Sequence, residues 1–210
     1  MNKMVSIGSW ITIGHPSIAE IMASSDLEWL CIDMEHTVID YYQAQQIIAA
    51  IQGKQKEAYV RVGDNNPRII KKMLDAGANG IIVPMINSVE DALKARDSVY
   101  YPPIGKRGVG LARAQEYGFK FEKYYNQQKN IKLIIQIEHF EAINNLEEIL
   151  SLDGIYGSFI GPYDLSGSIG KAGDFNNEKL IKLLNKYEKI SKKMNKSMGF
   201  HVIEPNHKLL

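Results

Sequence analysis

Cysteine is scarce in this sequence: there is one, Cys31, among 210 residues. A single thiol cannot form a disulfide within the chain, which excludes a disulfide-stapled fold. Cys31 lies in the apolar run from Trp29 to Ile32. This setting indicates a small buried side chain, because a reactive thiol needs electropositive, partly exposed surroundings. We therefore do not expect cysteine chemistry.

An excess of one charge and long apolar runs are also missing. Lysine and arginine number 25 against 24 acidic residues, a formal net charge of +1, so bulk charge gives no reason to expect nucleic acid or an anionic membrane as partner. No apolar run reaches the roughly 18 residues of a transmembrane helix, and the N-terminus lacks the pattern of a secretion signal. We expect a cytoplasmic protein that acts on small molecules.

Phosphate-cradling glycine loops are absent too, since neither the P-loop nor the dinucleotide-binding pattern occurs. What the sequence does contain is an alternation of short β-branched runs with amphipathic stretches, which is typical of a parallel sheet built from βαβ units. We expect strands at Val5–Ile11, Trp29–Asp33, Ala58–Val62, Gly80–Met85, Lys132–Glu138, Gly154–Ile160 and Ser197–Ile203. We expect helices at Ser17–Ser24, Asp40–Gln52, Pro67–Ala76, Ser88–Ser98, Glu141–Leu150 and Asn177–Asn195.

These elements predict one α/β domain over residues 1–210, organised as a (β/α)8 TIM barrel that lacks its last βα unit. A closed barrel typically has about 250 residues, whereas the seventh strand here precedes Leu210 closely. Open sheet edges should make such a chain unstable or cause it to associate. The stretch Tyr100–Tyr125 is the one long irregular segment, and segments of that length are usually lids or disordered.

Polar residues interrupt strands that should be apolar on both faces. Period-2 alternation turns Gln136 and Glu138 toward the barrel axis, and likewise Arg61, Asp33 and Glu35 on two other strands. All fall near the carboxyl ends of their strands, where barrel enzymes have their active sites. The alternative is a set of structural ion pairs at the barrel rim.

Two carboxylates come from neighbouring strands in this arrangement. Glu138 ends one strand, and Asp164 follows the next in a tight loop fixed by Gly161 and Pro162. Oxygen ligands in small number suit Mg²⁺ or Mn²⁺. A general acid and base pair, as in glycosidases, is the alternative, but it leaves Arg61 and the neighbouring glutamine without a role.

His36 is the candidate acid or base, because it directly follows a strand and has Asp33 and Glu35 nearby to orient and charge its imidazole. The other histidines have no such partners. Lys132 lies at the wrong end of its strand for a Schiff base, and the other lysines considered for that role sit on predicted helices. Metal-assisted chemistry is therefore favoured over imine chemistry.

Taken in order, seven segments resemble the class II pyruvate aldolases of the 2,4-dihydroxyhept-2-ene-1,7-dioate (hydroxy-oxo-acid) aldolase family, whose barrel is of the phosphoenolpyruvate/pyruvate type. The segments are Gly8–Trp10, Asp33–His36, Val60–Val62, Val83–Met85, Tyr101–Gly108, Gln136–Glu138 and Ile160–Ser166. They span nearly the whole chain, and the match is specific for the superfamily without specifying one substrate.

The resemblance implies a role for each polar residue. Glu138 and Asp164 would bind a divalent cation (Mg²⁺, Mn²⁺ or Co²⁺), and Gln136 would support bound pyruvate. Arg61 would bind the pyruvate oxygens and stabilise an enolate. His36, held by Asp33, would act as base on the aldol hydroxyl.

The resemblance also implies substrate contacts and assembly. Trp10, Pro162 and the amides near Gly161 would bind the substrate, with Arg113 reaching the aldehyde half. The family exchanges C-terminal helices between subunits, so we expect a homo-oligomer. Met34 and Thr37 replace smaller residues of many family members, which leaves the acceptor aldehyde open.

Two other functions remain open. One is a related metal-barrel lyase acting on a phosphoenolpyruvate-like or acyl-CoA substrate, of the citrate lyase β type, although the sequence shows no basic cluster to bind CoA. The other is a degenerate barrel that serves as a non-catalytic subunit. Binding of metal and pyruvate distinguishes the last from both enzymes.

Overall fold

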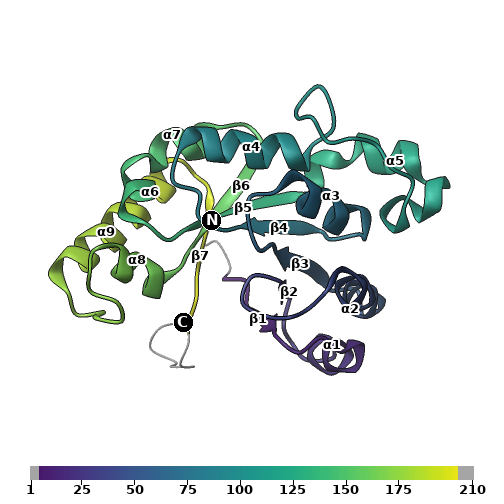
Figure 1. The fold of residues 1–210 in the computed structure, drawn as a ribbon, viewed down its shortest axis with the longest axis horizontal. Helices are drawn as coiled ribbons and strands as arrows, with labels where there is room; N and C mark the ends of the chain where they lie inside the picture. The colour runs from purple at the N-terminus through teal and green to yellow at the C-terminus, as the bar shows by residue number, and fades with distance from the viewer. Residues whose placement is uncertain (1–4, 203–210) are drawn as a thin grey trace.

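The computed structural model describes residues 5–202. Seven strands form one parallel sheet whose spatial order follows the chain. They are β1 Gly8–Ile11, β2 Trp29–Asp33, β3 Glu57–Arg61, β4 Gly80–Val83, β5 Lys132–Ile137, β6 Ile155–Ile160 and β7 Ser197–Phe200. Within the described residues β1 and β7 are not paired with each other, so the sheet curls into a partial barrel with two edges (Figure 1).

Helices connect the strands and lie along the outside of the curled sheet (Figure 1). They are α1 Pro16–Ala23, α2 Tyr41–Gly53, α3 Pro67–Asp75, α4 Val89–Val99, η1 Arg113–Gly118, α5 Phe121–Asn126, η2 Gln128–Asn130, α6 Phe140–Asn144, α7 Leu146–Ser151, α8 Pro162–Ser168 and α9 Glu178–Lys193. Capping boxes at Asp40 and Ser88 start α2 and α4, because these side chains accept bonds from otherwise unpaired amides. Over residues 5–202, no helix has both the length and the apolar character needed to span a bilayer.

The predicted strands are confirmed, and β2 has the predicted bounds. The end predicted for the last strand at Ile203 lies outside the described residues. Two other predictions, one of a helix and one of a loop, were wrong. The single helix predicted after β5 is split into α6 and α7 at Asn145, whose side-chain amide donates to the carbonyl oxygen of Asn87 at 2.8 Å. The tight loop predicted after β6 is the helix α8, because Pro162 suits a first helical turn, where its missing N–H costs nothing.

The inside of the curled sheet is filled in layers. At the amino ends of the strands, Lys132 donates to Glu57 at 2.8 Å and to the hydroxyl of Tyr59 at 2.9 Å. Above this lies a small apolar cluster built on Cys31, Tyr59 and Ile82, and burial raises the pKa of the Cys31 thiol. The main hydrophobic core lies between the sheet and its helices. Two inner layers therefore separate the carboxyl ends of the strands from the opposite face.

The segment predicted as irregular, residues 100–125, is neither a lid nor disordered. It contains η1 and most of α5 and is anchored by Arg107, whose buried guanidinium donates to Asp75 at 2.6 Å and to the Tyr124 hydroxyl at 3.2 Å. Asp75 ends α3, and helices antiparallel to their strands end at the amino face of the sheet. The segment therefore packs on the face opposite the predicted site.

Close approach of β6 and β7 yields a stability prediction. A Cβ added at Gly157 would lie 2.3 Å from the carbonyl oxygen of Ser197, its register partner. Gly157→Ala should lower the free energy of unfolding by about 1–3 kcal/mol, because backbone must move to make room. The control is Gly53→Ala at the end of α2, where a Cβ meets nothing within 4 Å. It should leave stability unchanged or raise it by up to about 1 kcal/mol. The midpoints of urea denaturation of the two variants measure these changes. Equal effects of Gly157→Ala and Gly53→Ala would contradict the close packing of β6 against β7.

Candidate active site

A buried ion pair joins β2 to β3 at the carboxyl end of the sheet. Asp33 and Arg61 are register partners, so their inward side chains lie next to each other. Arg61 donates through Nε to Asp33 Oδ1 at 3.0 Å and through Nη2 to Oδ2 at 2.8 Å. Its Nε also lies 3.3 Å from Glu35 Oε2, an ion pair without hydrogen-bond geometry. The guanidinium is therefore fixed along one edge.

Asp33 also orders the turn that follows β2. Its Oδ1 accepts bonds from the amides of Glu35 at 3.1 Å and His36 at 3.3 Å, and the Thr37 hydroxyl donates to its carbonyl oxygen. Burial alone would raise the pKa of Asp33, but the hydrogen bonds and charge of Arg61, with the two amides, lower it below its ordinary value. Asp33 is thus an anion that positions both the guanidinium and the next turn.

Of the two carboxylates expected to orient the imidazole of His36, only Glu35 approaches it. The imidazole is 66% exposed, and its Nε2 lies 3.7 Å from Glu35 Oε2, whereas Asp33 meets His36 only at the backbone amide. The expectation that Asp33 holds the imidazole is corrected, because the Asp33 carboxylate is occupied by Arg61 and two amides. Burial raises the pKa of Glu35 despite the opposing charges of Arg61 and His36.

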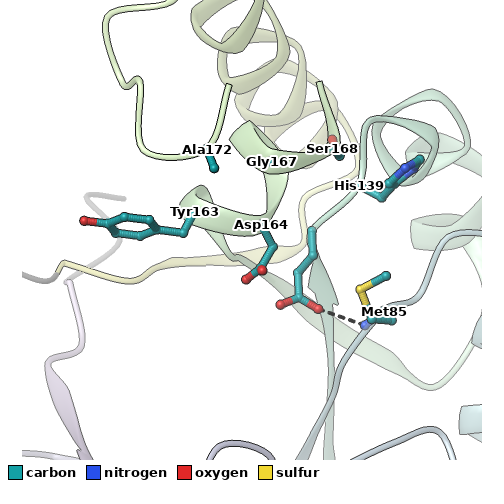
Figure 2. Close-up of a pocket in the computed structure, with 8 residues that line it drawn as sticks. Met85, His139, Tyr163, Asp164, Gly167, Ser168 and Ala172 are labelled. Atoms are coloured by element: carbon teal, nitrogen blue, oxygen red, sulfur yellow. Dashed lines mark hydrogen bonds between the residues drawn. The ribbon is translucent and has the colours of Figure 1, made fainter. Parts of the chain in front are cut away.

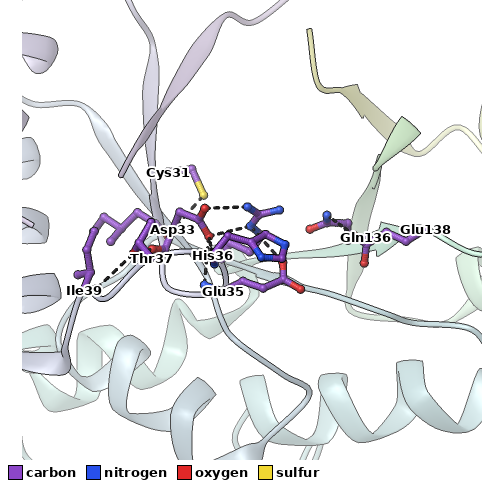
Figure 3. Close-up of polar contacts among 10 residues, drawn as sticks. Cys31, Asp33, Glu35, His36, Thr37, Ile39, Gln136 and Glu138 are labelled. Atoms are coloured by element: carbon purple, nitrogen blue, oxygen red, sulfur yellow. Dashed lines mark hydrogen bonds and ion pairs between the residues drawn. The ribbon is translucent and has the colours of Figure 1, made fainter. Parts of the chain in front are cut away.

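Gln136 and Glu138 lie on the other side of the barrel axis (Figure 3). Glu138 is only 3% exposed. Its Oε1 accepts from Gln136 Nε2 at 2.6 Å, and its Oε2 accepts from the amide of Met85 at 2.9 Å. Burial raises the pKa of Glu138 to about 7, with the negative charges of Glu35 and Asp164 adding to the effect. The positive charge of Arg61 opposes this rise, but no ion pair joins Glu138 to a cationic side chain among the described residues.

A cavity of about 380 Å³ opens beside Glu138. Asp164, in the first turn of α8, and Met85 both border it (Figure 2). The lining residues are Met85, Glu138, His139, Tyr163, Asp164, Gly167, Ser168 and Ala172. The cavity thus brings together the two carboxylates predicted to lie on neighbouring strands.

Gly161 contributes space to the site, because its amide is already bonded within the sheet. Its amide donates to the carbonyl oxygen of Ile137 at 3.1 Å, and Pro162 has no N–H, so the expected binding of a carboxylate by amides near Gly161 would fall to the next amides in the first turn of α8. A Cβ at Gly161 would lie 3.0 Å from the Glu138 side chain and 3.4 Å from that of Gln136. The glycine therefore leaves room for the Gln136–Glu138 pair.

Trp10 of β1 supports the guanidinium. The Cζ atom of Arg61 lies 4.5 Å from the centre of the indole ring, which is within the range of a cation–π contact. The same indole packs edge-on against Phe159 of β6, with 5.6 Å between ring centres. Trp10 thus lies against Arg61 and connects the first and sixth strands across the barrel interior, while its predicted contact with substrate stays a prediction.

Arg113 does not reach this site within the chain. Its Nη1 donates to Gln52 Oε1 at 2.8 Å and to the carbonyl oxygen of Ala76 at 2.9 Å, both at the ends of helices on the amino face of the sheet. The predicted contact with the aldehyde half is corrected, because the segment that carries Arg113 packs under the barrel.

Two residues near the site were missed from sequence. Met85 supplies an amide to Glu138 and has left-handed backbone, with φ 54°; the motif around it gave no hint of that donor. His201 follows β7, and its ring centre lies 5.4 Å from that of Trp10. No sequence neighbour offers it a partner, and the strand predicted over Ser197–Ile203 places it within the strand rather than at the carboxyl end.

The charges of the site fit a cation. Four carboxylates, Asp33, Glu35, Glu138 and Asp164, interact electrostatically around the single guanidinium of Arg61. Over residues 5–202 no three His, Cys, Asp or Glu side chains cluster as a ready metal site, so water or substrate oxygens would complete the shell around a divalent ion. The buried, uncompensated Glu138 beside Asp164 is the place that such an ion would neutralise.

The Asp33–Arg61 pair gives a prediction about pH. Asp33→Asn should destabilise the fold by about 3–5 kcal/mol at pH 7, because it leaves a buried guanidinium without its bidentate partner. Folding lowers the pKa of Asp33, so its contribution is complete above the unfolded pKa of about 4 and is lost as pH falls through the folded value. Urea unfolding at several pH values should show a shallower acid loss in Asp33→Asn than in wild type. Asp26→Asn, which changes an exposed residue, is the control. Parallel profiles of stability against pH for wild type and Asp33→Asn would refute the pairing of Asp33 with Arg61 as the cause.

Curated proteins similar to this chain are aldolases. The chain is 37% identical over 205 residues to the 2-keto-3-deoxy-L-rhamnonate aldolase of Klebsiella pneumoniae, and the match covers 95% of this chain and 75% of that protein. It is 34% identical over 175 residues to the 5-keto-4-deoxy-D-glucarate aldolase of Enterobacter sp. strain 638, and that match covers 83% of this chain and 68% of that protein.

Solved structures share the fold. A protein of the HpcH/HpaI aldolase/citrate lyase family from Burkholderia cenocepacia J2315 matches with a TM-score of 0.86 at 30% identity, over 93% of this chain and 79% of that one. Protein CitE of Mycobacterium tuberculosis, solved with magnesium and acetoacetate, matches with a TM-score of 0.61 at 13% identity, over 97% and 77% of the two chains. Residues 6–204 match the HpcH/HpaI aldolase/citrate lyase family, and this chain belongs to that family of carbon–carbon lyases.

Proposed function

We propose that this chain is a divalent-metal-dependent aldolase, which cleaves 4-hydroxy-2-oxo acids into pyruvate and an aldehyde and condenses the two in reverse. The observation that carries the proposal is the buried carboxylate Glu138, beside Asp164 and across the barrel axis from the fixed guanidinium of Arg61. The aldolase names of the relatives support the reaction type.

Glu138 and Asp164 would hold the cation, Mg²⁺, Mn²⁺ or Co²⁺. The fit rests on a buried carboxylate whose pKa is raised to about 7 and whose nearest charges include a second carboxylate. When bound, the ion supplies Lewis-acid stabilisation of negative charge on the pyruvate half. The amide of Met85 and the side chain of Gln136 orient Glu138. The buried Gln136 Oε1, which accepts no hydrogen bond from the described residues, remains open to bound water or substrate.

Arg61 would stabilise the enolate as it forms. Its Nε and Nη2 are occupied by Asp33, while Nη1 makes no hydrogen bond to another described residue and is available to substrate oxygens. Because Asp33 and Trp10 hold the guanidinium in place before the reaction, it meets the developing charge without reorganising.

His36 would act as the base. Cleavage breaks the bond between C3 and C4, the electron pair passes to C3 of the pyruvate enolate, and the C4 hydroxyl loses its proton as it becomes the aldehyde. The exposed imidazole of His36 would accept that proton, with Glu35 stabilising the imidazolium from 3.7 Å. Protonation at C3 then completes pyruvate.

An acyl-CoA substrate is less well supported. Basic side chains do gather between α3 and α4, around a cavity of about 750 Å³ that includes Arg68, Lys71 and Lys94. None of Glu138, Asp164 or Arg61 lines this groove, so no observation connects the groove to the proposed site.

The finer fold and assembly belong to the same proposal. We place the chain in a (β/α)8 barrel of the phosphoenolpyruvate/pyruvate type, of which the described residues supply seven strands, and in a homo-oligomer. Exposed apolar side chains support association, since Val109, Leu111 and Phe119 are 56%, 64% and 92% exposed within one short segment.

The metal gives the first functional prediction. Glu138→Gln and Asp164→Asn should each abolish aldol cleavage and weaken Mn²⁺ binding measured by titration calorimetry, because both carboxylates are needed to hold the ion. A chelator should remove activity reversibly. Glu141→Gln changes an exposed glutamate three residues after Glu138 that is paired with His139; it is the control and should bind Mn²⁺ normally. Full activity in excess chelator would reject the metal-dependent mechanism.

A second prediction separates the base from the enolate stabiliser. Oxaloacetate decarboxylation forms the same pyruvate enolate by loss of CO₂ and needs no base at a hydroxyl. His36→Ala should lose aldol cleavage by about a hundredfold while keeping much of its decarboxylation. Arg61→Ala should lose both, and Arg61→Lys should be poor because an ammonium cannot reproduce the planar fork. Equal losses of both reactions in folded His36→Ala would contradict its role as base.

A further inference from the structure

His201 lies beside Trp10 at the carboxyl end of the sheet and has no role in the mechanism above. It directly follows β7, at the carboxyl end of the sheet. Its ring centre lies 5.4 Å from that of Trp10 and 6.3 Å from that of Phe159. The imidazole is therefore held by aromatic rings from β1 and β6. The ring from β1 is Trp10, which also supports Arg61.

No hydrogen bond or ion pair joins the His201 side chain to another described residue, although the residue is half-buried. Burial lowers the pKa of His201, and the nearby positive charge of Arg61 lowers it further. At neutral pH it is thus a neutral ring, with one nitrogen that donates and one that accepts.

The position of His201 relates it to one half of the substrate. His36 follows β2, and Trp10 on the neighbouring β1 contacts His201 after β7. If the C4 hydroxyl faces His36, the carbons beyond C4 extend along Trp10 toward His201. The pyruvate half stays near Arg61 and the cavity of Glu138 and Asp164.

We propose that His201 determines the specificity of the aldolase for hydroxylated aldehydes, by exchanging hydrogen bonds with a hydroxyl on the carbon next to the aldehyde carbonyl. A hydroxyl both donates and accepts, as a neutral imidazole does. An apolar aldehyde would leave the imidazole facing methyl groups, its half-buried polar atoms unpaired, which a hydrogen-bonding site penalises. This inference rests on the aldolase function proposed above.

The test compares lactaldehyde with propanal, which differ by that one hydroxyl, as acceptors for pyruvate. In wild type kcat/KM should be higher for lactaldehyde. His201→Leu should reduce the ratio of the two kcat/KM values about three- to tenfold, the usual effect of one hydrogen bond. His201→Gln should keep part of the preference, because an amide also donates and accepts. His15→Gln, at the N-cap of α1, is the matched control and should keep the wild-type ratio.

Oxaloacetate decarboxylation by the same preparations reports on the pyruvate and metal end alone. If wild type decarboxylates but shows no preference for lactaldehyde, or if the ratio is unchanged in His201→Leu, the specificity role is wrong while the proposed function stands. If wild type neither decarboxylates nor condenses pyruvate with either aldehyde, the proposed function fails and takes this role with it. A lower ratio in His201→Leu, partly restored in His201→Gln, supports the inference.

Discussion

The two-point contact between Asp33 and Arg61 is the interaction on which the rest of the site depends. It joins register partners on β2 and β3, so it exists only when the parallel sheet has the observed pairing. Asp33 then uses the same carboxylate to bind the amides of Glu35 and His36, which sets the turn that presents the base. One anion therefore couples sheet register, guanidinium orientation and imidazole position.

The opposite side of the axis is built on a different principle, an anion left without a cation. Glu138 is held by Gln136 and by the amide of Met85, and Gly161 is small enough to let it lie there. Hydrogen bonds fix its direction, yet burial still disfavours its charge. Over residues 5–202 no cationic side chain forms an ion pair with this carboxylate, which is why the proposed metal ion is placed beside it.

Much of this could be predicted from sequence because parallel strands obey a simple rule of alternation. The inward parity of Arg61, Gln136 and Glu138 followed from period 2, and the carboxyl-end location followed from the barrel architecture. What could not be predicted depends on contacts distant in sequence. Asp33 turned out to hold Arg61 rather than the imidazole of its near neighbour, and Arg113 lies under the barrel because Gln52 and the Ala76 carbonyl bind it there.

The filled interior has a consequence for the order of events. The ion-paired layer of Lys132 and Glu57, with the apolar layer around Cys31 above it, blocks passage along the inside of the described sheet, so the mouth of the site lies at the carboxyl ends of the strands. In the proposed reaction the aldehyde half lies nearer that mouth and the pyruvate half lies deeper. The aldehyde must then depart first and pyruvate last, so cleavage would follow an ordered release in which pyruvate competes with the intact substrate for the free enzyme.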